Sequence, residues 1–324
     1  MSGDSSEKKR TVLVTGASGF GGSKVLSRLK DSGYNVIGTA HRNKPPESDV
    51  PFPLADLADA RAAFDMINKY QPDAVVHTAG NTHLDLCEIY QEQAWMSNVI
   101  AVKNLVGLAM LFGYRLLFFS SEQAYGEHPD GEGAFFLEDD PLSPLNFYGK
   151  TKMAAEEVIR EHLDNYIIFR PSLIYGWGNK SHISWCDHLY EDIEEGIQVK
   201  LYSDQVRSMI YVEDIAEAVL KFMEKPDITG VFNLGGDTPY RRSDFAAEFA
   251  RNWSFDEKLI APVTMEKYPP ETRRPKNCAL DIKKIKNVVG FNPTGLSDSL
   301  KIMKEKNPHP PLKNAEKKPD SGEK

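Results

Sequence analysis

The sequence predicts an α/β fold built on a doubly wound parallel sheet, with a smaller C-terminal α/β lobe. Short apolar runs alternate with helical patterns from residue 11 to residue 169, and this alternation implies parallel strands joined by helical crossovers. A glycine-rich turn follows the first apolar run, as a sharp strand-to-helix reversal requires. The 324 residues suit two lobes, at about 150 residues each.

The predicted strands and helices follow one another in a regular order. Residues 11–14 (TVLV) form the first strand, because a short continuous apolar run indicates a buried strand. Residues 23–30 form the first helix, with Val25, Leu26 and Leu29 at helical spacing. The other predicted elements of the sheet are strands 35–37, 74–77, 115–119 and 166–169 and helices 60–69, 91–112 and 146–162.

The regular alternation ends near residue 171. Residues 176–184 indicate a loop, and residues 188–196 and 211–224 indicate helices. We expect helix 211–224 and strand 231–234 to return to the sheet. The predicted divisions are a flexible N-terminus (1–10), a sheet domain (11–171 plus about 210–234), a smaller lobe (172–209 and 235–305) and a Pro- and charge-rich disordered tail (306–324).

Composition excludes several classes of protein. Lys and Arg number 39 and Asp and Glu 47, a net charge of −8, whereas nucleic-acid binding needs clustered cations. We find no apolar run of about 18 residues, so we expect no membrane span. The N-terminus carries no apolar signal sequence, and three separated cysteines fit a reducing compartment. We therefore expect a cytoplasmic protein. The spacing of His182, Cys186, Asp187 and His188 fits no standard metal site, so no metal is predicted.

Residues 15–22 (TGASGFGG) have the spacing of a phosphate-binding loop. Gly16, Gly19 and Gly22 permit a tight turn, close backbone approach to a pyrophosphate and close helix packing. The helix N-terminus that follows presents free N–H groups to an anion. Ser18 and Phe20 lie in the same loop, so the sheet domain is predicted to be a Rossmann domain.

The end of the second strand favours NADP(H), with NAD(H) as the alternative. No acidic residue for a ribose 2′-hydroxyl occurs in residues 38–44, whereas Arg42, helped by His41 or Lys44, could pair with a 2′-phosphate. Asp56 and Leu57 could lie at the adenine. Further cofactor contacts are expected at the end of the next strand, from Thr78, Ala79 and Gly80.

Tyr148 and Lys152 form a YxxxK pattern on a predicted helix, where residues four apart share a face. A lysine there would lower the pKa of the phenol and make it a usable proton donor or acceptor. Ser121, which follows the strand 115–119, could hydrogen-bond a substrate carbonyl oxygen.

These motifs resemble those of the extended short-chain dehydrogenase/reductase family over about residues 11–305. Within it, residues 82–88 (THLDLCE), 144–152 (PLNFYGKTK) and 274–281 (RPKNCALD) are most similar to the dTDP-4-dehydrorhamnose reductase group. That group includes the regulatory beta subunit of methionine adenosyltransferase. Asn98 matches the family's helix asparagine, which holds the active-site geometry.

The resemblance implies reduction of a nucleotide-linked 4-keto (deoxy)sugar by hydride from the nicotinamide, with proton donation by Tyr148. Ser121 would polarise the carbonyl oxygen, and Lys152 would hold the nicotinamide ribose. The segment 170–174 (RPSLI), with Pro171 and Ile174, would border the nicotinamide. The smaller lobe would bind the substrate, for which the candidate contacts are Thr82, Glu122, Arg207 and Arg274.

Two alternatives stay open. Dehydratases of the wider family carry Thr-Asp-Glu where this chain has Ser121-Glu122-Gln123, and Gln123 cannot act as their base. An NAD-dependent sugar-nucleotide epimerase, however, needs only the Tyr, the Lys and a tightly held cofactor. From another class, the chain could be an NADP-binding regulatory subunit of the methionine adenosyltransferase type. A homodimer or a regulatory partner fits either role.

Overall fold

The structure is a computed structural model and describes residues 9–42, 45 and 48–306. The predicted flexible N-terminus (1–10) and disordered tail (306–324) fall almost wholly outside these residues. Lys44, predicted to assist Arg42, also lies outside the described residues.

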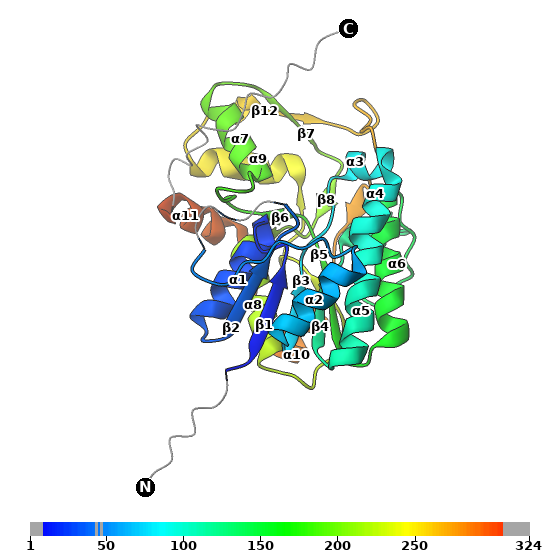
Figure 1. Cartoon of the computed structure of the whole chain (residues 1–324). Coiled ribbons are helices and arrows are strands. Elements are labelled where there is room, and N and C mark those ends of the chain that lie inside the picture. Colours follow the sequence, from blue (N-terminus) through cyan, green and yellow to red (C-terminus); the bar gives the residue numbers. More distant parts are fainter. Residues whose placement is uncertain (1–8, 43–44, 46–47, 307–324) are drawn as a thin grey trace.

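A six-stranded parallel sheet forms the centre of the molecule (Figure 1) and confirms the predicted fold class. The strand order is β10-β5-β4-β3-β1-β2. Every neighbouring pair is parallel, so each connection needs a crossover that can place a helix on a face of the sheet. The strands are β1 (Thr11–Thr15), β2 (Asn35–Thr39), β3 (Ala74–His77), β4 (Arg115–Phe119), β5 (Tyr166–Pro171) and β10 (Gly230–Leu234).

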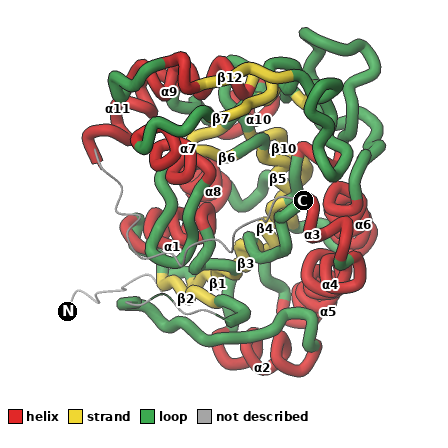
Figure 2. The backbone as a smooth tube through the Cα atoms, turned by 90° about the horizontal axis from the view of Figure 1, so that it is seen from above, coloured by secondary structure: helices red, strands yellow, loops and turns green. Residues whose placement is uncertain are grey.

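Helices cover both faces of the sheet, as the view in Figure 2 shows. Alternate strand residues serve the two faces: Val12 and Val14 lie in one core and Leu13 in the other. The first core is closed by α1 (Phe20–Asp31) and α8 (Val212–Met223), and the second by α2 (Ala60–Tyr70), α5 (Ala101–Phe112) and α6 (Phe147–His162).

The chain leaves the sheet after β5 and returns to it as α8 and β10. Phe232 of β10 pairs with Phe169 of β5. The helix α10 (Lys283–Val289) also packs on this side, through Ile285 and Val289. We expected residues 235–305 to belong wholly to the smaller lobe; α10 differs because its apolar side chains are buried beside β10.

The smaller lobe has its own aromatic core, which includes Trp177, Tyr190, Phe249 and Trp253. Its helix α7 begins before the predicted residue 188 because Ser184 and Asp187 form a capping box. The elements here are α7 (Trp185–Glu194), α9 (Arg242–Asn252), η3 (Glu257–Leu259), α11 (Leu296–Lys306), the strand pairs β6 (Ile174–Tyr175) with β9 (Ile210–Tyr211) and β7 (Val199–Tyr202) with β12 (Ile260–Val263), and the sheet β11 (Tyr240–Arg241), β8 (Val206–Arg207), β13 (Asn277–Cys278).

The predicted helix 91–112 is made of α4 (Gln91–Trp95), a π-helical turn η1 (Met96–Ile100) and α5. By length and composition alone this helix could cross a membrane. Its inner face, including Val102, Leu105 and Val106, lies in the core of the sheet domain, and this burial accounts for its apolar character. Two short helices complete the fold, α3 (Leu84–Ile89) and the 3-10 turn η2 (Glu122–Ala124).

Candidate active site

A cavity of about 250 Å³ lies at the carboxyl edge of the sheet, beside β1, β2 and β3. Open parallel sheets bind ligands at this edge. Its walls include six residues that the sequence predicted for the cofactor, namely Gly16, His41, Asp56, Leu57, Ala79 and Gly80. They also include residues without a predicted role, namely Thr39, Ala40, Ala55, His77, Asn81, Ser97 and Ala101.

The glycine-rich loop fits a phosphate group. Gly16 has φ of +65°, and a Cβ there would lie 2.7 Å from the Ala79 nitrogen. A Cβ on Gly22 would lie 2.3 Å from the Gly16 oxygen, so only glycine allows this close approach. The N-cap of α1, Gly19, offers no side-chain acceptor, which leaves the first N–H groups of the helix available to an anion.

A loop of the smaller lobe, which contains Asn179 and His182, contacts this phosphate loop. The Asn179 amide nitrogen donates to Ser23 Oγ at 2.9 Å and to the Gly19 oxygen at 3.3 Å. His182 stacks on Phe20, with the ring centroids 5.9 Å apart. Neither Asn179 nor His182 belongs to a spaced motif, so the sequence alone does not predict these two contacts.

The predicted 2′-phosphate contact, Arg42, is exposed. Its neighbour His41 lies 3.5 Å from Asp56, an ion pair only when His41 is protonated. At the end of β2, the buried hydroxyl of Thr39 has no hydrogen-bond partner among the described residues. An unpartnered polar group in the wall of the cavity is what a polar ligand would satisfy.

His77 is a buried, neutral imidazole in the wall of the cavity, and the charge of Lys152 acts on it. Burial, reinforced by the charge of Lys152, lowers the pKa of His77 to about 3. Its Nδ1 hydrogen-bonds Thr15 Oγ1 at 2.7 Å, and its ring stacks on Phe118. Its Nε2 is buried without a partner in the described part of the chain.

Ser121, Tyr148 and Lys152 come together where β4 ends beside α6. Asn146 caps α6 by accepting from the Gly149 nitrogen at 2.9 Å. Tyr148 and Lys152 are 6% and 3% exposed, and Ser121 hydrogen-bonds the Tyr148 hydroxyl. Lys152 Nζ donates to the Phe119 oxygen at 2.8 Å, so the lysine is anchored to the strand that leads into Ser121.

One electrostatic expectation is corrected. We expected Lys152 to lower the pKa of Tyr148, but burial raises it, although the hydrogen bond from Ser121 acts in the opposite direction. Lys152 Nζ lies over the Tyr148 ring, 5.8 Å from its centroid. Burial also lowers the pKa of Lys152 to about 8, against the raising effect of Glu156.

Asn98 lies in the π-helical turn η1 and links the segment after β3 to α6 by hydrogen bonds. Its Oδ1 accepts from the Asn81 nitrogen at 2.8 Å. Its Nδ2 donates to the Asn81 oxygen and to Thr151 Oγ1, both at 3.0 Å. Such insertions in α-helices are frequent at functional sites. The predicted substrate contact Thr82 follows Asn81 and is exposed.

Glu122 and Arg207, two predicted substrate contacts, are already paired with each other. Arg207 Nε lies 2.8 Å from Glu122 Oε1, and both side chains are buried. The other guanidinium nitrogens of Arg207 donate to backbone oxygens of Val206, Pro275 and Lys276. Direct substrate contacts by these two residues therefore stay predictions, and each would require this ion pair to open.

Arg274 and Arg242 retain unused donors. Arg274 Nη2 lies 3.0 Å from Asp85 Oδ2, while its buried Nε has no partner within the described residues. The buried Nε of Arg242 is likewise without one in the described chain. Burial, together with the charges of Arg207 and Arg274, lowers the pKa of Arg242 to about 10. Arg207 and Arg274 are each paired with a carboxylate, so Arg242 is the one of these three arginines without such a partner in the described residues.

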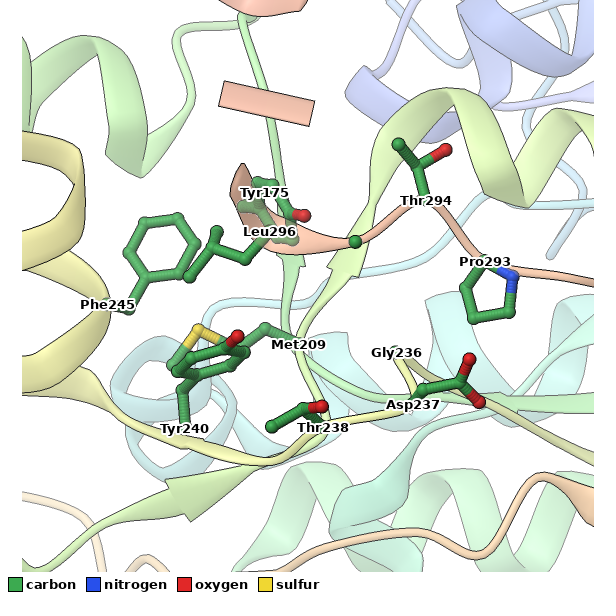
Figure 3. Close-up of a pocket in the computed structure, with 11 residues that line it drawn as sticks. Tyr175, Met209, Gly236, Asp237, Thr238, Tyr240, Phe245, Pro293, Thr294 and Leu296 are labelled. Atoms are coloured by element: carbon green, nitrogen blue, oxygen red, sulfur yellow. The ribbon is translucent and has the colours of Figure 1, made fainter. Parts of the chain in front are cut away.

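The chain between the lobes passes a second, smaller cavity. Pro171 ends β5 and Ile174 begins β6, and their contact with a nicotinamide stays a prediction. Beyond them, Tyr175, Phe245 and Leu296 line a space of about 70 Å³ that faces Asp237 and Pro293 on its other side (Figure 3). Ligand pockets typically have roughly 300–1,000 Å³, so this cavity is too small for a nucleotide.

The described residues hold no group of His, Cys, Asp and Glu side chains that could bind a metal ion. Asp187, which lies in the segment 182–188 considered above as a source of metal ligands, forms part of the capping box of α7. All three cysteines, Cys87, Cys186 and Cys278, are described, buried and free.

The phosphate loop, the parallel sheet and the Ser121–Tyr148–Lys152 arrangement define a protein of the extended short-chain dehydrogenase/reductase class. The family model described as the RmlD substrate binding domain matches residues 10–307. The chain belongs to this family.

Three comparisons place the chain within this class. It is 31% identical over 292 residues to the spore coat polysaccharide biosynthesis protein SpsK of Bacillus subtilis, covering 90% of this chain and 95% of SpsK. It is 28% identical to the methionine adenosyltransferase 2 subunit beta of Mus musculus, covering 90% and 87%. A dTDP-4-dehydrorhamnose reductase from Clostridium acetobutylicum has a similar structure, with a TM-score of 0.81, 26% identity and coverage of 92% and 100%.

Proposed function

We propose that the protein is an NADP(H)-dependent reductase of the keto group of a nucleotide-linked 4-keto (deoxy)sugar. The observation that carries this proposal is the buried Tyr148 hydroxyl, hydrogen-bonded to Ser121 at the carboxyl edge of the sheet. The similarity to SpsK and to a dTDP-4-dehydrorhamnose reductase supports the substrate class.

The chain's own residues have distinct roles in this reaction. Gly16, Gly19 and Gly22 would hold the cofactor phosphates, and Arg42 the 2′-phosphate. When bound, the nicotinamide cofactor supplies hydride to a carbonyl carbon. Tyr148 then gives its proton to the carbonyl oxygen, which Ser121 also contacts. The phenol is protonated at neutral pH, since burial raises its pKa, so Tyr148 carries the proton that this step needs.

The direct test is the loss of NADPH absorbance with a panel of nucleotide-linked 4-keto sugars. Turnover with one panel member would establish the reductase and name its substrate class. NADPH binding without turnover on any member would contradict the reductase assignment and favour the regulatory role described below.

Replacing Arg42 with leucine is expected to weaken NADPH binding by about 10- to 100-fold, because a charged hydrogen-bond pair contributes about 1.5–3 kcal/mol. NADH binding should be unchanged, since NADH lacks the 2′-phosphate. Calorimetric titration of both cofactors provides the measurement. Arg61→Leu, an exposed arginine on α2 paired with Asp65, is the control. Equal losses for the two cofactors would contradict the 2′-phosphate role.

The position and charge of Arg242 support the proposal that the substrate carries a diphosphate. Its guanidinium lies 5.1 Å from the Trp185 ring centroid, beside Arg274, and it has an unused buried donor. Arg242→Gln is expected to weaken binding of dTDP by about tenfold or more, with NADPH affinity unchanged. Arg251→Gln on the same helix, where Arg251 pairs with Glu248 at the surface, is the matched control. Unchanged dTDP affinity in Arg242→Gln would remove this support.

A second candidate function is an NADP-binding regulatory subunit. The observation in its favour is the 28% identity to a methionine adenosyltransferase beta subunit over 90% of this chain. A stable complex with a methionine adenosyltransferase catalytic subunit, together with absent turnover, would support it. A homodimer and a cytoplasmic location also remain proposals.

A further inference from the structure

A buried ion pair links β5 to α6, the helix that carries Tyr148 and Lys152. Arg170 of β5 and Glu156 of α6 are each 1% exposed. Arg170 Nη2 donates to Glu156 Oε2 at 2.6 Å, and its Nε donates to both carboxylate oxygens at 3.0 and 3.2 Å. Arg170 Nη1 also donates to the Tyr125 hydroxyl at 2.8 Å and to the Glu138 oxygen at 2.9 Å. The pair is therefore fully hydrogen-bonded and fixed in place.

This pair joins the three elements that carry the proposed chemistry. Glu156 is one helical turn after Lys152 on α6, so both side chains lie on one face of the helix. The Ser120 hydroxyl donates to Glu156, and Ser120 directly precedes Ser121. Arg170 directly precedes Pro171, at the end of β5. A change in the pair would consequently reach Ser121, Lys152 and Pro171 together.

We propose that Arg170 and Glu156 are positioning residues that hold the ends of β4, β5 and α6 in register and set the charge state of Lys152. Both side chains are 1% exposed and hydrogen-bonded to each other, so we expect them to act through their neighbours and not by contact with a ligand. The inference rests on the proposed function for its cofactor, but its readout does not depend on turnover.

The titration of Lys152 can be measured separately, because three neighbouring titratable groups stay neutral over the same pH range. His77 of β3 has its pKa lowered to about 3 by burial, and Cys87 of α3 has its pKa raised to about 11. Tyr148 of α6 has a raised pKa. These three groups therefore stay neutral between about pH 6 and pH 10, and Lys152, with a pKa of about 8, is the one of the four that titrates. Glu156 opposes the lowering of that pKa.

The two partners should shift this titration in opposite directions. Glu156→Gln removes a negative charge and leaves Arg170 unpaired, so the lysine loses its proton at lower pH. Arg170→Gln leaves the Glu156 carboxylate unpaired, so the lysine keeps its proton to higher pH. Each shift is expected to be about one pH unit or more, as for charges a few ångströms apart. A role confined to stability would lower the melting temperature of both variants and shift the titration of neither.

The experiment measures the association constant of NADPH by calorimetry between about pH 6 and pH 10, with a melting temperature for each protein. The wild-type protein should lose affinity above about pH 8, where Lys152 deprotonates. The pH at which the affinity falls should be lower in Glu156→Gln and higher in Arg170→Gln. In the double variant it should be close to the wild-type value, because that variant buries no unpaired charge. The phosphates of NADPH titrate identically in all four proteins and cancel in the comparison.

Opposite shifts would support the proposal. Shifts in one direction, absent shifts, or failure of both single variants to fold while the double variant folds would overturn it and leave a purely structural ion pair. If no charge-altered variant folds, the proposal is overturned as well. A wild-type protein that binds no NADPH would overturn the proposed function and this inference together, whereas NADPH binding without turnover would contradict only the reductase assignment.

Discussion

Tyr148→Phe is expected to lower the turnover of NADPH with its keto-sugar substrate by about 10²- to 10⁴-fold, the usual contribution of a positioned acid or base. The variant loses only the hydroxyl that meets Ser121, and its ring still packs against Cys87 and Ala94. Affinity for NADPH should therefore be nearly unchanged. Steady-state kinetics and calorimetry on the same preparation separate the two effects.

A second buried tyrosine provides the control for Tyr148→Phe. Tyr114 is 4% exposed, and its hydroxyl donates to the Leu105 oxygen at 2.5 Å, in the helical core rather than the active site. Tyr114→Phe should lose stability but keep its turnover. Equal activity losses in the two variants, or full activity in Tyr148→Phe, would show that the phenol of Tyr148 is not the proton donor.

Lys152→Met is expected to lower kcat by about 10²-fold or more, the cost of misplacing groups in a catalytic site. Wild-type activity should fall as the pH rises through about 8, because the ammonium of Lys152 loses its proton there. This alkaline limb should be absent in Lys152→Met. A pH profile of kcat/KM for both proteins makes the comparison.

Lys150 is the matched control for Lys152. It lies on the same helix, two residues earlier, and is exposed to solvent. Lys150→Met should keep both the wild-type rate and the alkaline limb. If the limb persisted unchanged in Lys152→Met, it would belong to another group, and the assignment of the lowered pKa to a catalytic role would be wrong.

The sequence predicts those parts of the molecule that depend on patterns among residues close together in the chain. Apolar runs located the strands, and the spacing of Gly16, Gly19 and Gly22 located a turn where a Cβ does not fit. The helical spacing of Tyr148 and Lys152 placed two residues on one face of α6. In each case the residues that form the pattern lie within a few positions of one another in the sequence.

The rest depends on contacts between distant segments, which no spacing encodes. Asn179 reaches Ser23 across 156 residues, and Arg242 stacks on Trp185 from another helix. The pKa of Tyr148 was predicted in the wrong direction because burial depends on the whole fold. Glu156 was assigned no role because its partner Arg170 lies on the following strand, 14 residues away.

The position of β10 has a consequence for the synthesis of this chain. β10 is the edge strand that covers β5, and it lies more than fifty residues further along the chain. Until residues 230–234 have left the ribosome, the outer edge of β5 has no strand to pair with. Exposed edges of apolar strands promote association between chains. The nascent protein therefore passes through a stage in which this edge is open to pairing with another chain.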